Sequence, residues 1–310
     1  MLNGLRFTLC MFLILFASAN KAAGATNVSG NITTDTPWTL AGSPYIVTGD
    51  IYVYGANSPT LTIEAGVTVK FNQYRMLYIG SGATPGALNA VGTATAPIIF
   101  TSSQATPTSG YWGGIYFSDG TVDANTVLDY VTVEYGGYSY NSNISLNSAA
   151  PTIKNSTIRK SSGYGINASY SSPFIQNNTI TENGTSGVYG NNSSFTITGN
   201  TITNNGAYGI YDSTGSATLL SGSTFSGNGS YPIRMGINQT GVVNTYETNG
   251  NNAIEVVGGT VSQSLTVKNS GLPYVITRDI YVYGASAPTL TIEPGVTVKF
   301  NQYRKNRPSL

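Results

Sequence analysis

Hydrophobic positions recur along the middle of this chain at a fixed interval. Four six-residue segments share one pattern, in which an apolar residue opens the segment and Thr followed by an apolar residue closes it. The closing apolar residues occupy positions 158, 180, 202 and 225, so the interval is 22, 22 and 23 residues. A second apolar column has the same intervals and consists of Ile166, Val188, Ile210 and Ile233. A fixed period between about 20 and 50 residues predicts a solenoid.

The composition of each repeat indicates strands and turns. Gly and Asn interrupt apolar runs of three to five residues, and no helical periodicity follows the N-terminal segment. Short parallel strands stacked about 4.8 Å apart would place like residues above like residues. Alternation then predicts an outward threonine ladder of Thr157, Thr179, Thr201 and Thr224. Asparagines are expected to stack at the turns, with the following glycines supplying positive φ; these asparagines are Asn183, Asn205 and Asn228.

A longer repeat encloses the short one. Residues Pro44–Arg75 match Pro273–Arg304 without a gap at an offset of 229, and a weaker match extends upstream. The sequence therefore predicts one domain over 26–256 and a second tandem copy over 257–304, followed by an unrelated tail at 305–310. The second copy is either a short terminal cap or the start of a module that continues in the natural protein. The abrupt change after Arg304 favours truncation or a frameshift.

The N-terminus predicts export. Arg6 precedes an apolar run of about a dozen residues, and small residues follow it, as in a secretory signal peptide. The run is shorter than the roughly 20 residues of a membrane span, and cleavage after Ala25 is expected. Charged residues make up 9% of the chain, against about 25% in ordinary globular proteins. The near-neutral mature chain is therefore expected to have no nucleic-acid partner. Since the apolar run is short and removed by cleavage, no membrane span is expected in the mature chain.

The columns between Leu128 and Ile233 resemble the right-handed parallel β-helix family, the architecture of the pectate-lyase-like superfamily. The flanking motifs Pro59–Phe71, Ala90–Thr101 and Trp112–Phe117 resemble the opening coils of secreted bacterial members. The resemblance implies an all-β, right-handed parallel β-helix with coils of about 22 residues, preceded by a signal peptide. It implies little about activity, because sites are grafted onto folds.

The resemblance suggests two kinds of enzyme site, a calcium-dependent lyase site and a hydrolase site with paired carboxylates. The acids concentrated after Trp112–Phe117 are weak catalytic candidates: Asp119, Asp123, Asp129 and Glu134. Asp123 and Asp129 are also weak Ca²⁺ candidates, and no other cofactor is expected. The chain contains no histidine, which excludes a Ser–His–Asp triad.

A binding surface is the alternative to a catalytic site. Outward residues next to the second apolar column form a predicted carbohydrate-binding strip, namely Asn167, Tyr189, Tyr211 and Arg234. The opposing interpretation is that these tyrosines only shield the strand ladders from water. The preferred hypothesis is a secreted or cell-surface, non-catalytic module that binds polysaccharide or a surface glycan, or acts as a spacer. The alternative is a lyase or hydrolase of acidic polysaccharide. Separately, the strands at the end of the second copy have no following coil to pair with, which predicts edge-to-edge self-association.

Overall fold

The computed structural model describes residues 24–214, 219–239 and 244–301. The predicted signal peptide, apart from Gly24 and Ala25, and the tail at 305–310 lie outside these residues. Within them the chain is almost entirely short strands and turns, and the expected all-β solenoid is confirmed. No helix in the described ranges is long and apolar enough to span a membrane.

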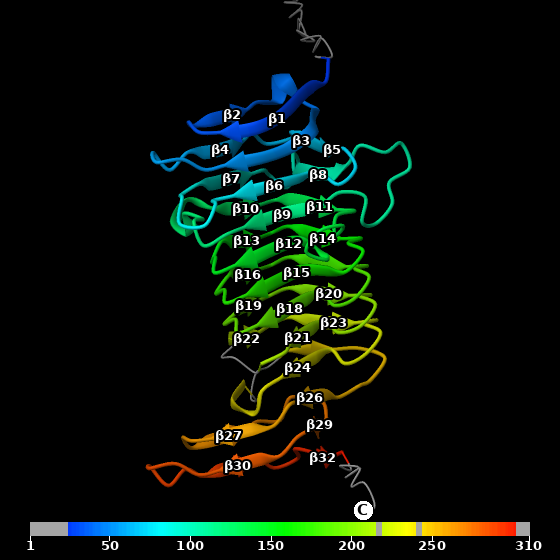
Figure 1. Cartoon of the computed structure of the whole chain (residues 1–310). Helices are drawn as coiled ribbons and strands as arrows, with labels where there is room; N and C mark the ends of the chain where they lie inside the picture. Colours follow the sequence, from blue (N-terminus) through cyan, green and yellow to red (C-terminus); the bar gives the residue numbers. More distant parts are fainter. Residues whose placement is uncertain (1–23, 215–218, 240–243, 302–310) are drawn as a thin grey trace, which may run out of the picture.

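The strands form a rod in which the chain winds around one axis, so that each strand lies beside its equivalent in the next coil (Figure 1). Three faces run along the rod, and every strand pair is parallel. At the N-terminal end, β1 (Thr26–Ile32) pairs with β3 (Tyr45–Val53), which is long enough to belong to two faces. The 3₁₀ turns η1 (Leu40–Gly42) and η2 (Asp123–Asn125) connect strands in the first half of the rod.

The first part of β3 begins the threonine face, which carries the predicted threonine ladder. Its further strands are β5 (Thr68–Phe71), β8 (Ile98–Ser102), β11 (Val131–Glu134), β14 (Thr157–Arg159), β17 (Thr179–Thr181), β20 (Thr201–Thr203), β23 (Thr224–Ser226) and β25 (Thr245–Tyr246). The four threonines of the ladder are exposed or half-buried, while the apolar residue after each is fully buried.

The second part of β3 begins the tyrosine face. Its further strands are β6 (Met76–Ile79), β9 (Gly114–Phe117), β12 (Ser142–Asn147), β15 (Tyr164–Ser169), β18 (Val188–Asn191), β21 (Ile210–Asp212), β24 (Ile233–Met235) and β26 (Ile254–Val256). The third face is a separate 8-stranded sheet. It consists of β2 (Thr36–Trp38), β4 (Thr60–Ile63), β7 (Ala87–Val91), β10 (Val127–Asp129), β13 (Thr152–Lys154), β16 (Phe174–Gln176), β19 (Thr196–Thr198) and β22 (Leu219–Ser221).

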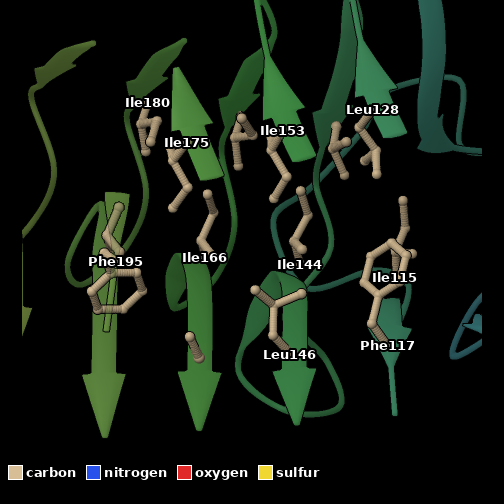
Figure 2. Packing of buried hydrophobic residues seen from close by; sticks show 14 of the residues in the cluster. Ile115, Phe117, Leu128, Ile144, Leu146, Ile153, Ile166, Ile175, Ile180 and Phe195 are labelled. Carbon is tan, nitrogen blue, oxygen red and sulfur yellow. The ribbon is translucent and has the colours of Figure 1, made fainter. Parts of the chain in front are cut away.

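The core is a set of apolar columns that fill the inside of the rod. Ile158 pairs with Ile180, Ile180 with Ile202, and Ile202 with Phe225, and all four side chains are fully buried. Figure 2 shows the aliphatic side chains of neighbouring coils directed into the space between the faces. Burial of each such side chain contributes about 1.5–3 kcal/mol, so the predicted columns are the main source of stability.

Asparagines form hydrogen-bonded ladders at the corners. The amide nitrogen of Asn183 donates to the Oδ1 of Asn205 at 2.9 Å, and Asn205 donates to Asn228 at 3.0 Å. A second ladder joins Asn178 to Asn200 at 3.0 Å. All five side chains are buried, so these bonds satisfy polar groups that water does not reach.

The glycine after each ladder asparagine has a different role from the predicted one. Positive φ occurs one residue before the asparagine, at Glu182 (55°), Asn204 (54°) and Gly227 (65°). A Cβ added at Gly184 would instead collide with the carbonyl oxygen of Ser162 on the preceding coil. The prediction of positive φ at these glycines is therefore wrong, because glycine is needed there for the close approach of two coils.

The second copy reproduces the strand pairing of the first. Its strands are β27 (Gly259–Val261), β28 (Leu265–Val267), β29 (Tyr274–Ile276), β30 (Ile280–Val282), β31 (Leu290–Ile292) and β32 (Val298–Phe300). Gly259 pairs with Ile280 as Gly30 pairs with Ile51. Leu265 pairs with Leu290 as Thr36 does with Leu61, so the two copies fold alike.

At the junction, however, the second copy is displaced around the rod by one face. β29 corresponds to the threonine-face part of β3, but it pairs with β26 of the tyrosine face. β27, which corresponds to the second part of β1, packs against the 3₁₀ turn η3 (Ile237–Gln239), between β24 and β25 in the chain. In Figure 1, β27 and β30 accordingly lie on the side of the third face. The second copy thus continues the axis of the rod but not its faces.

Candidate functional site

The tyrosine face carries one column of outward-facing residues along most of the rod. Each member pairs in register with the next through parallel strands. In chain order the column consists of Tyr52, Tyr78, Tyr116, Ser145, Asn167, Tyr189, Tyr211 and Arg234. Such a column extends an aromatic surface over many coils from residues far apart in sequence.

Ring contacts connect most of this column. Tyr52 and Tyr78 stack with centroids 4.8 Å apart and planes 4° apart. Tyr189 and Tyr211 stack at 5.5 Å and 14°. Tyr140 stacks on Tyr116 at 4.4 Å where the column itself changes to serine. Because the ring faces of these pairs contact each other, the pairs present mainly ring edges and hydroxyl groups outward. Tyr78 and Tyr116, in contrast, meet edge to face at 63°.

Four phenols of this face have a pKa above the ordinary value and remain protonated at ordinary pH. Burial raises the pKa of Tyr78 to about 12, and the neighbouring phenols and Asp50 add to the effect. Burial also raises the pKa of Tyr52, Tyr140 and Tyr164. A protonated phenol both donates and accepts hydrogen bonds, so the face offers uncharged donors and acceptors.

The structure places the four residues of the predicted strip next to one another, with one difference. Asn167, Tyr189 and Tyr211 are half-buried at the surface, and the Asn167 amide donates to the carbonyl oxygen of Tyr140 at 3.1 Å. Arg234, expected to face solvent, is only 8% exposed. Its Nε pairs with Glu255 Oε1 at 3.2 Å and its guanidinium lies over the Tyr211 ring at 4.3 Å. Arg234 therefore packs against Tyr211 as a buried neighbour of the strip and is not one of its exposed residues.

The four candidate catalytic acids are not gathered into one site. Asp129 pairs with Lys154 at 3.3 Å, and Glu134 pairs with Arg159 at 2.7 Å. Asp123 accepts a backbone hydrogen bond from Ala150 at 2.7 Å, and Asp119 is exposed. Within the described ranges, no three Asp, Glu, Cys or His residues come together as a metal site. Each partnered acid thus has a local structural contact.

Two known families match parts of this chain. The family described as "Right handed beta helix region" matches residues 142–302, which is just over half of the chain. The chain belongs to this right-handed β-helix family. A "Pectate-lyase like beta helix domain" matches residues 30–125 of the same β-helix. No curated protein matches the chain.

Solved structures with a similar β-helix include the periplasmic alginate epimerase AlgG. It shares 13% identity at a TM-score of 0.40, with 89% of this chain and 73% of that chain covered. A single-residue variant of AlgG gives 13% identity and a TM-score of 0.42, with 89% and 77% covered.

Four members of the column on the tyrosine face, three tyrosines and Ser145, were missed in the sequence. Tyr52, Tyr78 and Tyr116 precede the regular 22-residue repeat, where coil lengths vary and no constant interval connects them. A signal was nevertheless present, because each follows a buried aliphatic residue and precedes another apolar one. The second asparagine ladder was also missed, although Asn178 and Asn200 lie one 22-residue period apart.

Proposed function

We propose that this β-helix is a secreted, non-catalytic module of an extracellular or cell-surface protein that binds polysaccharide along its tyrosine face. The observation that carries the proposal is the column from Tyr52 to Tyr211, in register across neighbouring coils. A polysaccharide chain lying parallel to the rod would meet a similar set of polar groups at each coil.

The chemistry of the face suits neutral hydrogen bonding to sugars. Burial raises the pKa of Tyr78, so its phenol stays protonated, and the Asn167 amide lies in the same column. Stacked rings lose little conformational freedom on binding because their neighbours already hold them. The face would therefore bind through hydroxyl groups and ring edges. Sugar rings would not stack flat on the stacked tyrosine pairs.

The rod itself supports the spacer part of the function. Stacked coils and asparagine ladders continue from the first copy to the start of the second, where β26 pairs with β29. A module of this form would hold its binding face at a distance from whatever anchors the protein.

The test removes hydroxyl groups and keeps the rings. Replacing both Tyr189→Phe and Tyr211→Phe should weaken polysaccharide binding about tenfold, because each lost neutral hydrogen bond is worth about 0.5–1.5 kcal/mol. Affinity electrophoresis against a panel of neutral and acidic polysaccharides would measure the change. The melting temperature should stay the same, since ring stacking is retained.

Tyr170→Phe is the matched control, because this tyrosine is 64% exposed and lies outside the column. Unchanged binding by the double variant would contradict a role for the tyrosine hydroxyls. If the protein releases unsaturated sugar ends from an acidic polysaccharide, which ultraviolet absorbance would detect, the lyase alternative is favoured instead.

A further inference from the structure

The displacement between the copies leaves an open cleft of about 520 Å³ at their junction. One wall belongs to the end of the first copy, and the other to the start of the second. The lining includes Asn238 on the first wall and Thr260, Arg278, Asp279 and Tyr281 on the second. The Asn238 amide donates to the carbonyl oxygen of Thr260 at 3.2 Å, which connects the two walls.

The cleft contains the one charge that differs between the two closely matched segments. Pro44–Arg75 and Pro273–Arg304 differ at six of 32 positions, and only the change from Gly49 to Arg278 alters charge. In the first copy a Cβ at Gly49 would lie 3.0 Å from the Cβ of Ser29, and the position equivalent to Ser29 is Gly258. Arg278 is exposed and forms no ion pair with any described residue.

The polar groups of the cleft suit an uncharged, hydroxyl-rich ligand. Arg278 and the neighbouring Asp279 cancel in charge, and together they offer donors and acceptors. The Asp279 carboxylate accepts a hydrogen bond from the Tyr281 hydroxyl at 3.2 Å, and Tyr281 is 53% exposed. The carboxylate of an acidic sugar would be attracted to the Arg278 guanidinium but repelled by the Asp279 carboxylate. The volume lies within the roughly 300–1,000 Å³ typical of small-ligand sites.

We propose that this junction cleft is a saccharide site that takes a ring of a neutral sugar. The Arg278 guanidinium and the Asn238 amide donate to ring hydroxyls, and Asp279 accepts from one. The site is distinct from the tyrosine face, and it exists only where two copies meet. It does not depend on polysaccharide binding along the tyrosine face.

Hydrogen–deuterium exchange of the whole chain would locate the binding. The probes are neutral oligosaccharides of glucose, galactose, mannose and N-acetylglucosamine, with oligogalacturonate as the acidic comparison. At least one neutral probe should protect residues 257–261 and 276–282. Arg278→Gly, which restores the residue of the first copy, should weaken this binding about tenfold or more. Lys268→Ser removes an equal charge from an exposed position outside the cleft and should leave binding unchanged.

Failure of this site and failure of the tyrosine face give different results. Protection confined to the tyrosine face, or equal loss in the Arg278 and Lys268 variants, overturns the junction site and leaves the proposed function standing. Stronger protection by oligogalacturonate overturns the assignment of a neutral sugar. Protection at the junction that survives Tyr189→Phe with Tyr211→Phe supports a separate site.

Discussion

Arg234 and Glu255 form a buried ion pair where the two copies meet. Their side chains are 10% and 11% exposed, and the Tyr208 hydroxyl donates to Glu255 Oε2 at 3.0 Å. Thr277 of the second copy donates to the other carboxylate oxygen at 3.3 Å. Since a buried charge is costly without its partner, this pair makes the end of the first copy depend on both residues.

Replacing Glu255→Gln should therefore lower the free energy of unfolding by about 3–5 kcal/mol, because the Arg234 charge loses its partner. Urea denaturation followed by circular dichroism would measure the loss. Glu182→Gln is the matched control, since Glu182 is 54% exposed and pairs with Lys160 at 3.8 Å. That change should cost less than about 1 kcal/mol. Equal effects of the two substitutions would contradict a buried role for Glu255.

The strands of this protein are too short to be stable alone, and the corner ladders join them into coils. Asn205 accepts from Asn183 and donates to Asn228, so one side chain contacts the coils before and after it. Its amide also donates to the Ile180 carbonyl oxygen at 3.2 Å. Loss of this side chain would leave several buried groups without partners.

Asn205→Ala should lower the free energy of unfolding by at least about 2 kcal/mol, because each orphaned buried group costs about 1–3 kcal/mol. Thermal and urea unfolding would measure it. Asn57→Ser, which places the second copy's residue at an exposed position of the first, is the matched control. A loss no larger than that of the control would show that the ladder contributes little to stability.

The short strands could be predicted from the periodicity of the sequence, because the apolar positions that face the core repeat at a fixed interval. Ile153, Ile175 and Ile197 recur every 22 residues and are all fully buried. The corners could not be predicted to the same detail. Which residue takes positive φ depends on how closely the coils approach, and the sequence does not display that distance. The orientation of the tyrosine rings could not be predicted from the sequence either, because it depends on contacts between coils.

On the scale of the whole molecule, the second copy covers the last coil of the first. Ile254 and Val256 are fully buried beneath Tyr274 and Ile276, with which they pair in register. A chain shortened after Gly271 would expose these residues to water, and its melting temperature should fall by several degrees.

Thermal melts followed by circular dichroism would compare that chain with one ending at Asn301, which retains all six strands of the second copy. Equal melting temperatures would show that the second copy does not stabilise the first.

The sequence by itself determined the class of fold, the coil length, the inward columns and the equivalence of the two copies. These properties follow from local alternation and fixed intervals, which the order of residues records directly. Only the tertiary structure decided the ring-to-ring stacking of the tyrosines, the burial of Arg234 and the displacement of the second copy by one face. Each of these depends on packing between coils, which is set by side-chain shape and the path of the chain around its corners.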